Sequence, residues 1–192
     1  MMGSFRCRGF TLIELMVTIA VLAVLLMIGI PSFAELVRNN RLTTNANQLI
    51  TAMNLAKSEA IRRRIRVTLR ATAVPNWENG WEVFTDNDGS GTKNGADEVL
   101  RVYGALQGVY TLRANGNFVN FISFLPTGRS NSNVGGSFAI CDNSDGNDLP
   151  EARTSRLLVI NAMGRVRVAV DSDNNGIPNK DDGTDLASCI NP

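Results

Sequence analysis

Histidine is absent from this 192-residue chain, only 6% of its residues are aromatic, and its formal net charge is only +1. Without histidine the chain lacks the commonest general base, the usual zinc ligand and every catalytic triad built on imidazole. It also lacks a G-x-S-x-G elbow and a phosphate-binding loop, so we expect no enzyme activity, no cofactor and no metal centre built on histidine. The net charge gives no overall reason to expect a nucleic acid or an acidic partner.

Apolar residues, in contrast, form a long run near the N-terminus, after Arg6 and Arg8. Between Phe10 and Phe33 the polar side chains are Thr11, Glu14, Thr18 and Ser32. A helix rises about 1.5 Å per residue, so this run can cross a hydrocarbon core of about 30 Å. A secretory signal would instead end at a small-residue cleavage site with a polar start to the mature chain. The run therefore predicts a membrane-spanning helix, and the arginines favour a cytoplasmic N-terminus.

Glu14 is the unusual residue of this run, because a carboxylate in lipid is costly and normally has a partner. It lies in the stretch "RGFTLIEL". This stretch resembles the type IV prepilin signature, with a basic leader ending in Gly9, a mature Phe10 and a glutamate at the fifth mature position. The resemblance implies cleavage after Gly9 by a prepilin peptidase and methylation of the Phe10 amine. It also implies that Glu14 pairs with the N-terminal amine of a neighbouring subunit during assembly.

The same resemblance implies three segments. Residues 1–9 are expected to be the cleaved leader, residues 10–33 the transmembrane and assembly helix, and residues 34–192 a periplasmic globular head. The chain is then expected in the bacterial inner membrane first and in an extracellular filament afterwards.

Beyond the apolar run the helical periodicity continues to about Arg64. The positions of its apolar stripe are Leu42, Ala46, Leu49, Met53, Ala56 and Ala60. The period then changes to two, which predicts strands at 65–73, 80–84, 98–103, 117–125, 136–141, 156–162 and 165–170. The predicted fold is α+β, with a long N-terminal helix packed on antiparallel sheet.

The helix end and two later motifs resemble the GspH/FimT family of minor pilins and pseudopilins, which includes FimU. The shared positions are an A-x-S-E-A-x-x-R helix end at 56–63, a G-W-x-V-F strand at 80–84, and the turn residues Phe124, Pro126 and Gly128. The resemblance implies a type IV pilin-like fold and a filament subunit at or near the tip that supports assembly and priming. Its partners would be other pilins and the inner-membrane assembly machinery. The alternative it leaves open is a tip pseudopilin of a type II secretion system that contacts protein.

Three cysteines are present, and Cys7 lies in the expected leader. Cys141 and Cys189 would be exported to an oxidising compartment, where a pair favours a disulfide. Closing a loop of about 48 residues stabilises a protein by roughly 4 kcal/mol on the chain-entropy model. The expected bond would tie the end of the chain to a strand.

Two acidic stretches, "DNDGSGTKNGAD" at 86–97 and "DSDNNGIPNKDD" at 171–182, have the spacing of calcium loops. Their candidate oxygen ligands are Asp86, Asp88, Ser90 and Asp97 in the first, and Asp171, Asp173, Asn175 and Asp182 in the second. Both end in aspartate where the calcium loop has glutamate. Turns need the same residue types, so a structural turn and a calcium site both stay open, with the turn favoured.

Arginines occur in two clusters. The run at 62–70 closes the predicted helix, where cations favour the helix dipole; a solvated helix end and a partner surface both stay open. The second cluster is Gly164-Arg165-Val166-Arg167, a G-R-x-R pattern that resembles a C-terminal motif of FimT-type minor pilins that take up DNA. On one face of a strand, Arg165 and Arg167 would stand about 7 Å apart and could contact phosphates without reading bases. Arg129 is a third candidate if its turn converges with this one. An ordinary exposed strand face is the alternative.

Overall fold

The computed structural model describes residues 10–192 of the chain. Its one helix, α1 (Leu12–Arg63), is 52 residues long and continues through Pro31. It ends one residue before the predicted end, and the next residue, Arg64, has a positive φ of 58°. Contacts divide the chain at Arg38 into two units, residues 1–38 and residues 39–192, so the two parts of α1 are described separately.

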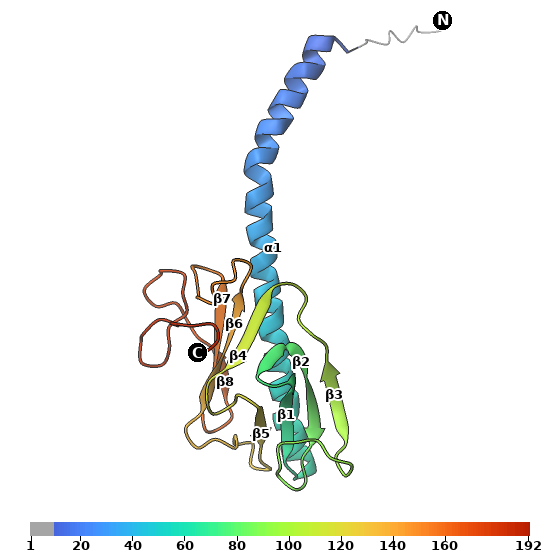
Figure 1. Cartoon of the computed structure of the whole chain (residues 1–192), viewed down its shortest axis with the longest axis vertical. Helices are drawn as coiled ribbons and strands as arrows, with labels where there is room; N and C mark the ends of the chain where they lie inside the picture. Colours follow the sequence, from blue (N-terminus) through green and yellow to red (C-terminus); the bar gives the residue numbers. More distant parts are fainter. Residues whose placement is uncertain (1–9) are drawn as a thin grey trace, which may run out of the picture. The chain divides into compact units, whose positions relative to one another are not determined.

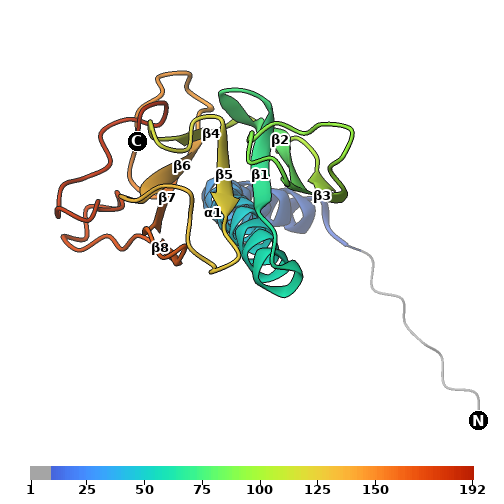
Figure 2. The same cartoon turned by 90° about the horizontal axis from the view of Figure 1, so that it is seen from below.

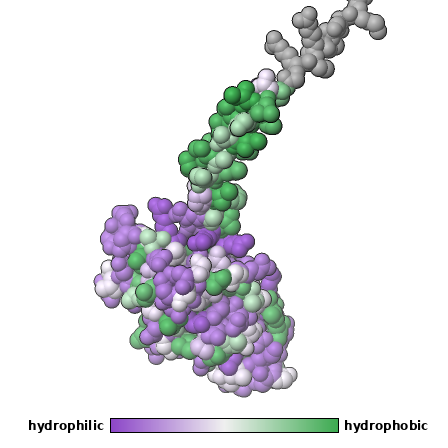
Figure 3. Space-filling model, turned by 45° about the horizontal axis from the view of Figure 1, so that its top comes forward, coloured by the Kyte–Doolittle hydropathy of each residue, from purple (hydrophilic) through white to green (hydrophobic). Residues whose placement is uncertain are grey.

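The first part of α1 is apolar and exposed. None of the most hydrophobic 18-residue window is buried, and by length and composition this helix can cross a membrane. Figure 3 shows the hydrophobic side chains gathered on this part of the helix. Such a surface needs lipid or other apolar helices around it. The structure is therefore consistent with membrane anchoring.

The second part of α1, from Asn39 onward, packs on the sheets. All six stripe positions predicted from the sequence are at most 3% exposed. Two four-stranded antiparallel sheets pack against one side of this part (Figures 1 and 2). In order, the first sheet contains β3 (Val99–Tyr103), β2 (Asn76–Thr85), β1 (Val67–Ala73) and β5 (Phe121–Phe124). The second contains β4 (Tyr110–Ala114), β6 (Gly136–Asp142), β7 (Ser155–Ile160) and β8 (Val166–Val168).

The main core joins the helix stripe to the inner faces of both sheets. Trp77 and Phe138 meet edge to face, with ring centroids 5.0 Å apart, and Phe118 stacks on Phe138 at 6.0 Å. The indole N–H of Trp77 donates to the Val119 carbonyl, so the buried ring leaves no polar atom unpaired. These contacts fix the two sheets against one another across α1.

A second, smaller core lies on the outer face of the second sheet. It contains Ala139, Cys141, Leu157, Ala169, Leu186 and Cys189. The last two belong to residues 171–192, which we call the C-terminal tail. The predicted disulfide is confirmed: Cys141 on β6 bonds to Cys189, with 5.9 Å between their Cα atoms. The tail is therefore covalently held across the sheet.

Several strand predictions need correction. β4 was not predicted, although all of its residues except Arg113 are buried. Only 121–124 of the predicted strand 117–125 is extended, because the preceding residues form a turn in which the Phe118 N–H donates to the Asn115 carbonyl. β2 begins four residues before the prediction, and β8 covers only the middle of 165–170.

Candidate functional site

Two turns that are far apart in the sequence lie side by side in the head. In one, the Gly128 N–H donates to the Leu125 carbonyl, and in the other the Gly164 N–H donates to the Asn161 carbonyl. The Ser130 N–H joins them by donating to the Ala162 carbonyl at 3.2 Å. The convergence on which the candidate role of Arg129 depended is therefore present. We call these two segments, 125–130 and 161–165, the paired turns.

Gly164 is the point of closest approach between the paired turns. Its φ is +67°, and a Cβ at this position would lie 2.5 Å from the Gly128 carbonyl oxygen and 3.0 Å from the Phe124 ring. Only glycine satisfies both the backbone angle and the space. The close backbone approach at Gly164 is therefore to Gly128 of the other turn.

Lys57 fastens the paired turns to the helix. Its ammonium donates to the carbonyl oxygens of Met163 at 3.1 Å and Gly164 at 2.9 Å. The lysine stem also lies against the other turn, because a Cβ on Gly128 would be 3.2 Å from Lys57 Cε. Sequence reasoning missed this residue. Lysine within the A-x-S-E-A helix end was the available signal, but its partners are more than 100 residues away.

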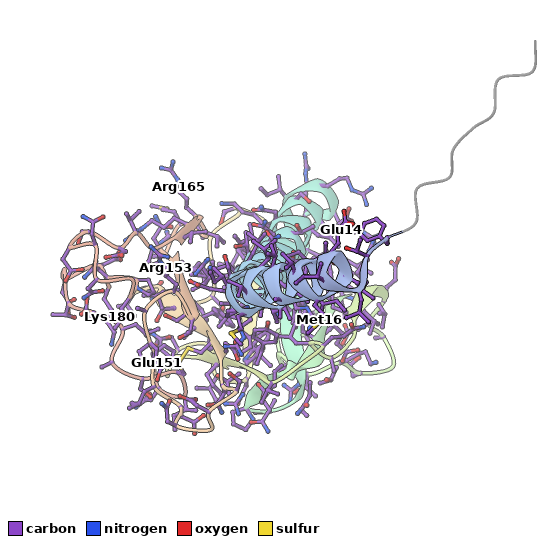
Figure 4. All side chains as sticks on the ribbon, turned by 90° about the horizontal axis from the view of Figure 1, so that it is seen from above. Glu14, Met16, Glu151, Arg153, Arg165 and Lys180 are labelled. Carbon is purple, nitrogen blue, oxygen red and sulfur yellow. A yellow bond between two sulfur atoms is a disulfide. The ribbon has the colours of Figure 1, made fainter. Side chains whose placement is uncertain are left out.

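Arg129 and Arg165 are the exposed cations of the paired turns. The Arg165 N–H donates to Asn161 Oδ1, which fixes the backbone, while its guanidinium has no ion-pair or hydrogen-bond partner within residues 10–192. Figure 4 shows the Arg165 side chain projecting outward from the head. The Arg129 guanidinium likewise has no ion-pair or hydrogen-bond partner among the described residues. Both guanidiniums can therefore contact an anion without first breaking an interaction.

Arg167 differs from Arg165. It lies on β8 opposite Val159 of β7, on the face that carries the C-terminal tail, and its guanidinium forms an ion pair with Asp181 of that tail. The sequence placed both arginines on one face of one strand. Arg165 instead precedes β8 and belongs to the turn, so the two side chains have different surroundings.

The arginine run after the helix is largely engaged within the head. Arg62 and Arg63 both donate to the Glu59 carboxylate, and Arg63 also donates to Glu98. The hydrogen bond from Arg62, and then that from Arg63, lowers the pKa of Glu59, and the hydrogen bond from Arg63 lowers the pKa of Glu98. These contacts favour the helix-end interpretation over a basic partner surface.

The two acidic loops use their carboxylates as turn acceptors. Asp86 accepts from the Thr68 hydroxyl at 2.6 Å and from the Gly91 N–H at 3.1 Å, while Asp171 accepts from the Gly176 N–H at 2.7 Å. Within residues 10–192, no group of three or more histidine, cysteine, aspartate or glutamate side chains is arranged to hold a metal ion. The hydrogen bonds favour the turn interpretation.

The N-terminal candidates lie at the start of α1, except Gly9, which is outside the described residues. Phe10 is 72% exposed. The Glu14 N–H donates to the Thr11 hydroxyl at 3.3 Å, so Thr11 caps the helix and Glu14 is in its first turn, where a carboxylate is favoured by the helix dipole. Figure 4 shows Glu14 at this end of the helix.

Comparisons with known proteins find two family models that match parts of this chain. Residues 45–164 match the family model described as type II transport protein GspH, and residues 4–30 match the prokaryotic N-terminal methylation motif. No match is found among curated proteins.

Solved structures with a similar fold include the type IV minor pilin FimU of Pseudomonas aeruginosa strain PAO1 in two crystal forms. They are 23% and 21% identical to this chain, with TM-scores of 0.59 and 0.55. The alignments cover 79% and 78% of this chain and 96% and 100% of theirs. The minor pseudopilin EpsH from the type 2 secretion system of Vibrio cholerae is 11% identical, with a TM-score of 0.48, over 69% of this chain and 98% of its own. The likeness to FimU confirms the predicted α+β, type IV pilin-like fold.

Proposed function

The chain belongs to the GspH family, and from this premise we propose that it is a minor type IV pilin carried at or near the tip of a filament. Its role is structural: it supports assembly and priming of the filament together with other pilins and the inner-membrane machinery. It is not an enzyme. The support is the family match together with a helix whose first part is apolar and exposed.

The N-terminus is proposed to mature as in prepilins. The leader, residues 1–9, is cleaved after Gly9 by a prepilin peptidase, and the Phe10 amine is methylated; the match to the methylation motif supports this. Residues 10–33 then hold the chain in the inner membrane with its N-terminus cytoplasmic, and residues 34–192 form the periplasmic head. Glu14 pairs with the N-terminal amine of a neighbour, which neutralises a carboxylate in lipid.

The head is further proposed to bind DNA for natural transformation, through the paired turns. The observation that carries this proposal is the pair of exposed cations, Arg129 and Arg165, on turns fastened to α1 by Lys57. Gly164 is proposed to contribute by setting the turn. Arg167 is a weaker candidate, because DNA must first displace Asp181. Phe124, the aromatic ring beside Gly164, is fully buried and cannot stack on a base. Two guanidiniums without an exposed ring beside them fit weak contact with phosphates that does not depend on base sequence.

The test is DNA binding by the full chain in detergent micelles, measured by fluorescence anisotropy with a labelled short duplex. Two phosphate contacts predict an affinity that falls about tenfold between about 50 and about 200 mM salt. Replacing both residues, Arg129→Gln with Arg165→Gln, should remove most of the binding and flatten this salt dependence. The matched control is Arg101→Gln, an exposed arginine on the first sheet, which should leave binding unchanged. Equal binding by the double variant and the control would refute the DNA site.

A second candidate function is that of a pseudopilin in type II secretion, which the description of the matching family favours. The exposed surface of the head would then contact protein. Deleting the gene and scoring piliation, DNA uptake and secretion separately distinguishes the two. Loss of secretion with normal DNA uptake would support the second candidate and contradict the first.

A further inference from the structure

A groove runs along the second part of α1 beside the outer strand of the first sheet. It consists of two adjoining hollows of about 660 Å³ and about 410 Å³, which share Thr44, Gln48 and Gly104 in their linings. One wall is the polar side of α1, and the other is β3 with the loop that follows it. All of these residues belong to residues 39–192, so the groove lies within one unit.

The β3 wall has an unpaired edge. β3 is the outermost strand of its sheet, and within residues 10–192 it pairs only with β2. Its side chains Val99 and Val102 are 41% and 62% exposed. An outer strand presents free backbone N–H and C=O groups, to which another extended chain can add as a further strand.

An unsatisfied polar atom lies in the lining. Asn45 of α1 is 9% exposed and lines the smaller hollow, and its side-chain Nδ2 has no hydrogen-bond partner among residues 10–192. A buried amide without a partner is costly, and buried polar groups in proteins are nearly always bonded. The Asn45 amide can therefore donate a hydrogen bond to an acceptor oxygen of a ligand that enters the groove.

The charges in the lining are of one sign. Arg41 and Arg101 line the groove, and no aspartate or glutamate of residues 10–192 does. The Arg101 guanidinium lies 5.4 Å from the centroid of the Tyr103 ring, and that ring stacks on Trp81 at 5.4 Å. The Arg101 guanidinium is thus held against a tyrosine ring that itself packs on the buried Trp81. This arrangement suits a carboxylate and disfavours a basic ligand.

We propose that this groove binds an extended, acidic segment of a neighbouring pilin subunit, which adds to β3 as a further strand. The added strand satisfies the free edge of β3, an oxygen of the segment accepts from Asn45, and its carboxylates pair with Arg41 and Arg101. This inference rests on the filament-subunit part of the proposed function and is independent of DNA binding.

The experiment is site-specific crosslinking of the full chain in cells. Val102 is replaced by the photoreactive amino acid p-benzoylphenylalanine, and in a matched control the same replacement is made at Val134, an exposed valine that is not part of the groove lining. The expected result is a crosslink from position 102, and not from 134, to an extended segment of another pilin that carries two or more carboxylates. A crosslink to a helix, to a basic segment or to a protein other than a pilin would overturn the proposal, as would equal yields at the two positions.

Two further variants test the contacts. Charge reversal, Arg41→Glu with Arg101→Glu, should lower the crosslink yield at least about fivefold, since attraction becomes repulsion. Asn45→Leu should lower the yield by about two- to tenfold through the lost hydrogen bond, while the melting temperature stays the same or rises because an unpaired buried atom is removed. A fall in melting temperature with an unchanged yield would mean that Asn45 has a structural role. That result would overturn the proposed hydrogen bond from Asn45 to the bound segment.

Failure of this inference can be told apart from failure of the proposed function. If the wild-type chain enters filaments and binds DNA while the crosslink at position 102 is absent, only the groove assignment is wrong. If the charge-reversal variant keeps its DNA binding and loses the crosslink, the two surfaces are separate, as proposed.

Discussion

The paired turns and the C-terminal tail are neighbouring regions of the head that hold arginines two residues apart in different ways. At the paired turns, the Arg165 side chain has no partner within residues 10–192; its backbone N–H donates to Asn161, and Lys57 donates to the preceding carbonyl of Gly164. On the tail side, Arg167 is bound to Asp181, in a segment with five aspartates and one lysine. Both arginines are exposed, so what distinguishes them is the charge of the segment that lies beside each one.

The largest expected effect comes from releasing the tail. Cys189→Ser removes the bond to Cys141 and should lower the free energy of unfolding by about 4 kcal/mol, because the loop between the two residues is no longer closed in the unfolded state. Denaturant unfolding in micelles measures this change. Ser188→Ala, a neighbouring change of similar size, is the control and should cost less than about 1 kcal/mol. A loss below about 1 kcal/mol for Cys189→Ser would mean that the tail is held by its side-chain contacts alone.

The second-largest effect is expected from replacing one glycine in each region by alanine. Gly164 and Gly183 both have positive φ, +67° and +83°, but a Cβ meets the Gly128 carbonyl oxygen at the first and nothing within 4 Å at the second. Gly183→Ala should therefore cost about 1 kcal/mol from backbone strain alone, and Gly164→Ala about 2–3 kcal/mol from strain together with the clash. The same unfolding measurement checks both.

Gly164→Ala should also weaken DNA binding by the full chain, because Arg165 follows the displaced residue directly. Gly183→Ala should leave binding unchanged. Equal stability losses in the two variants would contradict the close contact between the paired turns.

How far the sequence could predict these regions depends on the distance between interacting residues. The helix stripe from Leu42 to Ala60 was predicted correctly because it depends on a local periodicity. The disulfide was predicted because only two exported cysteines were available. β4 was missed because five residues between glycine- and asparagine-containing turns carry a weak signal.

The site needed contacts that local patterns do not contain. Lys57 reaches residues 106 and 107 positions later, and Arg167 meets an aspartate that only the folded tail brings back. Val166 packs against the main core, whereas Val168 and Val170 are exposed. Period-two alternation predicted a single strand over 165–170. It could not show that the strand begins only after Arg165, which is decided by the turn at Gly164.

The smallest effect is expected from a variant that removes the ion pair of Arg167, so that this arginine resembles Arg165. Asp181→Asn removes the charge that holds Arg167 and should make a third guanidinium available to phosphate. DNA affinity at low salt should rise by about two- to fourfold, and the salt dependence should steepen by about one counterion. The stability change should be under about 1 kcal/mol, since Arg167 and Asp181 are 50% and 63% exposed and such pairs contribute little. Asp182→Asn, next to it but bonded to Thr184, is the control. If Asp181→Asn does not strengthen binding while Arg165→Gln still weakens it, Arg167 takes no part in DNA contact, and the difference between the two regions goes beyond one ion pair.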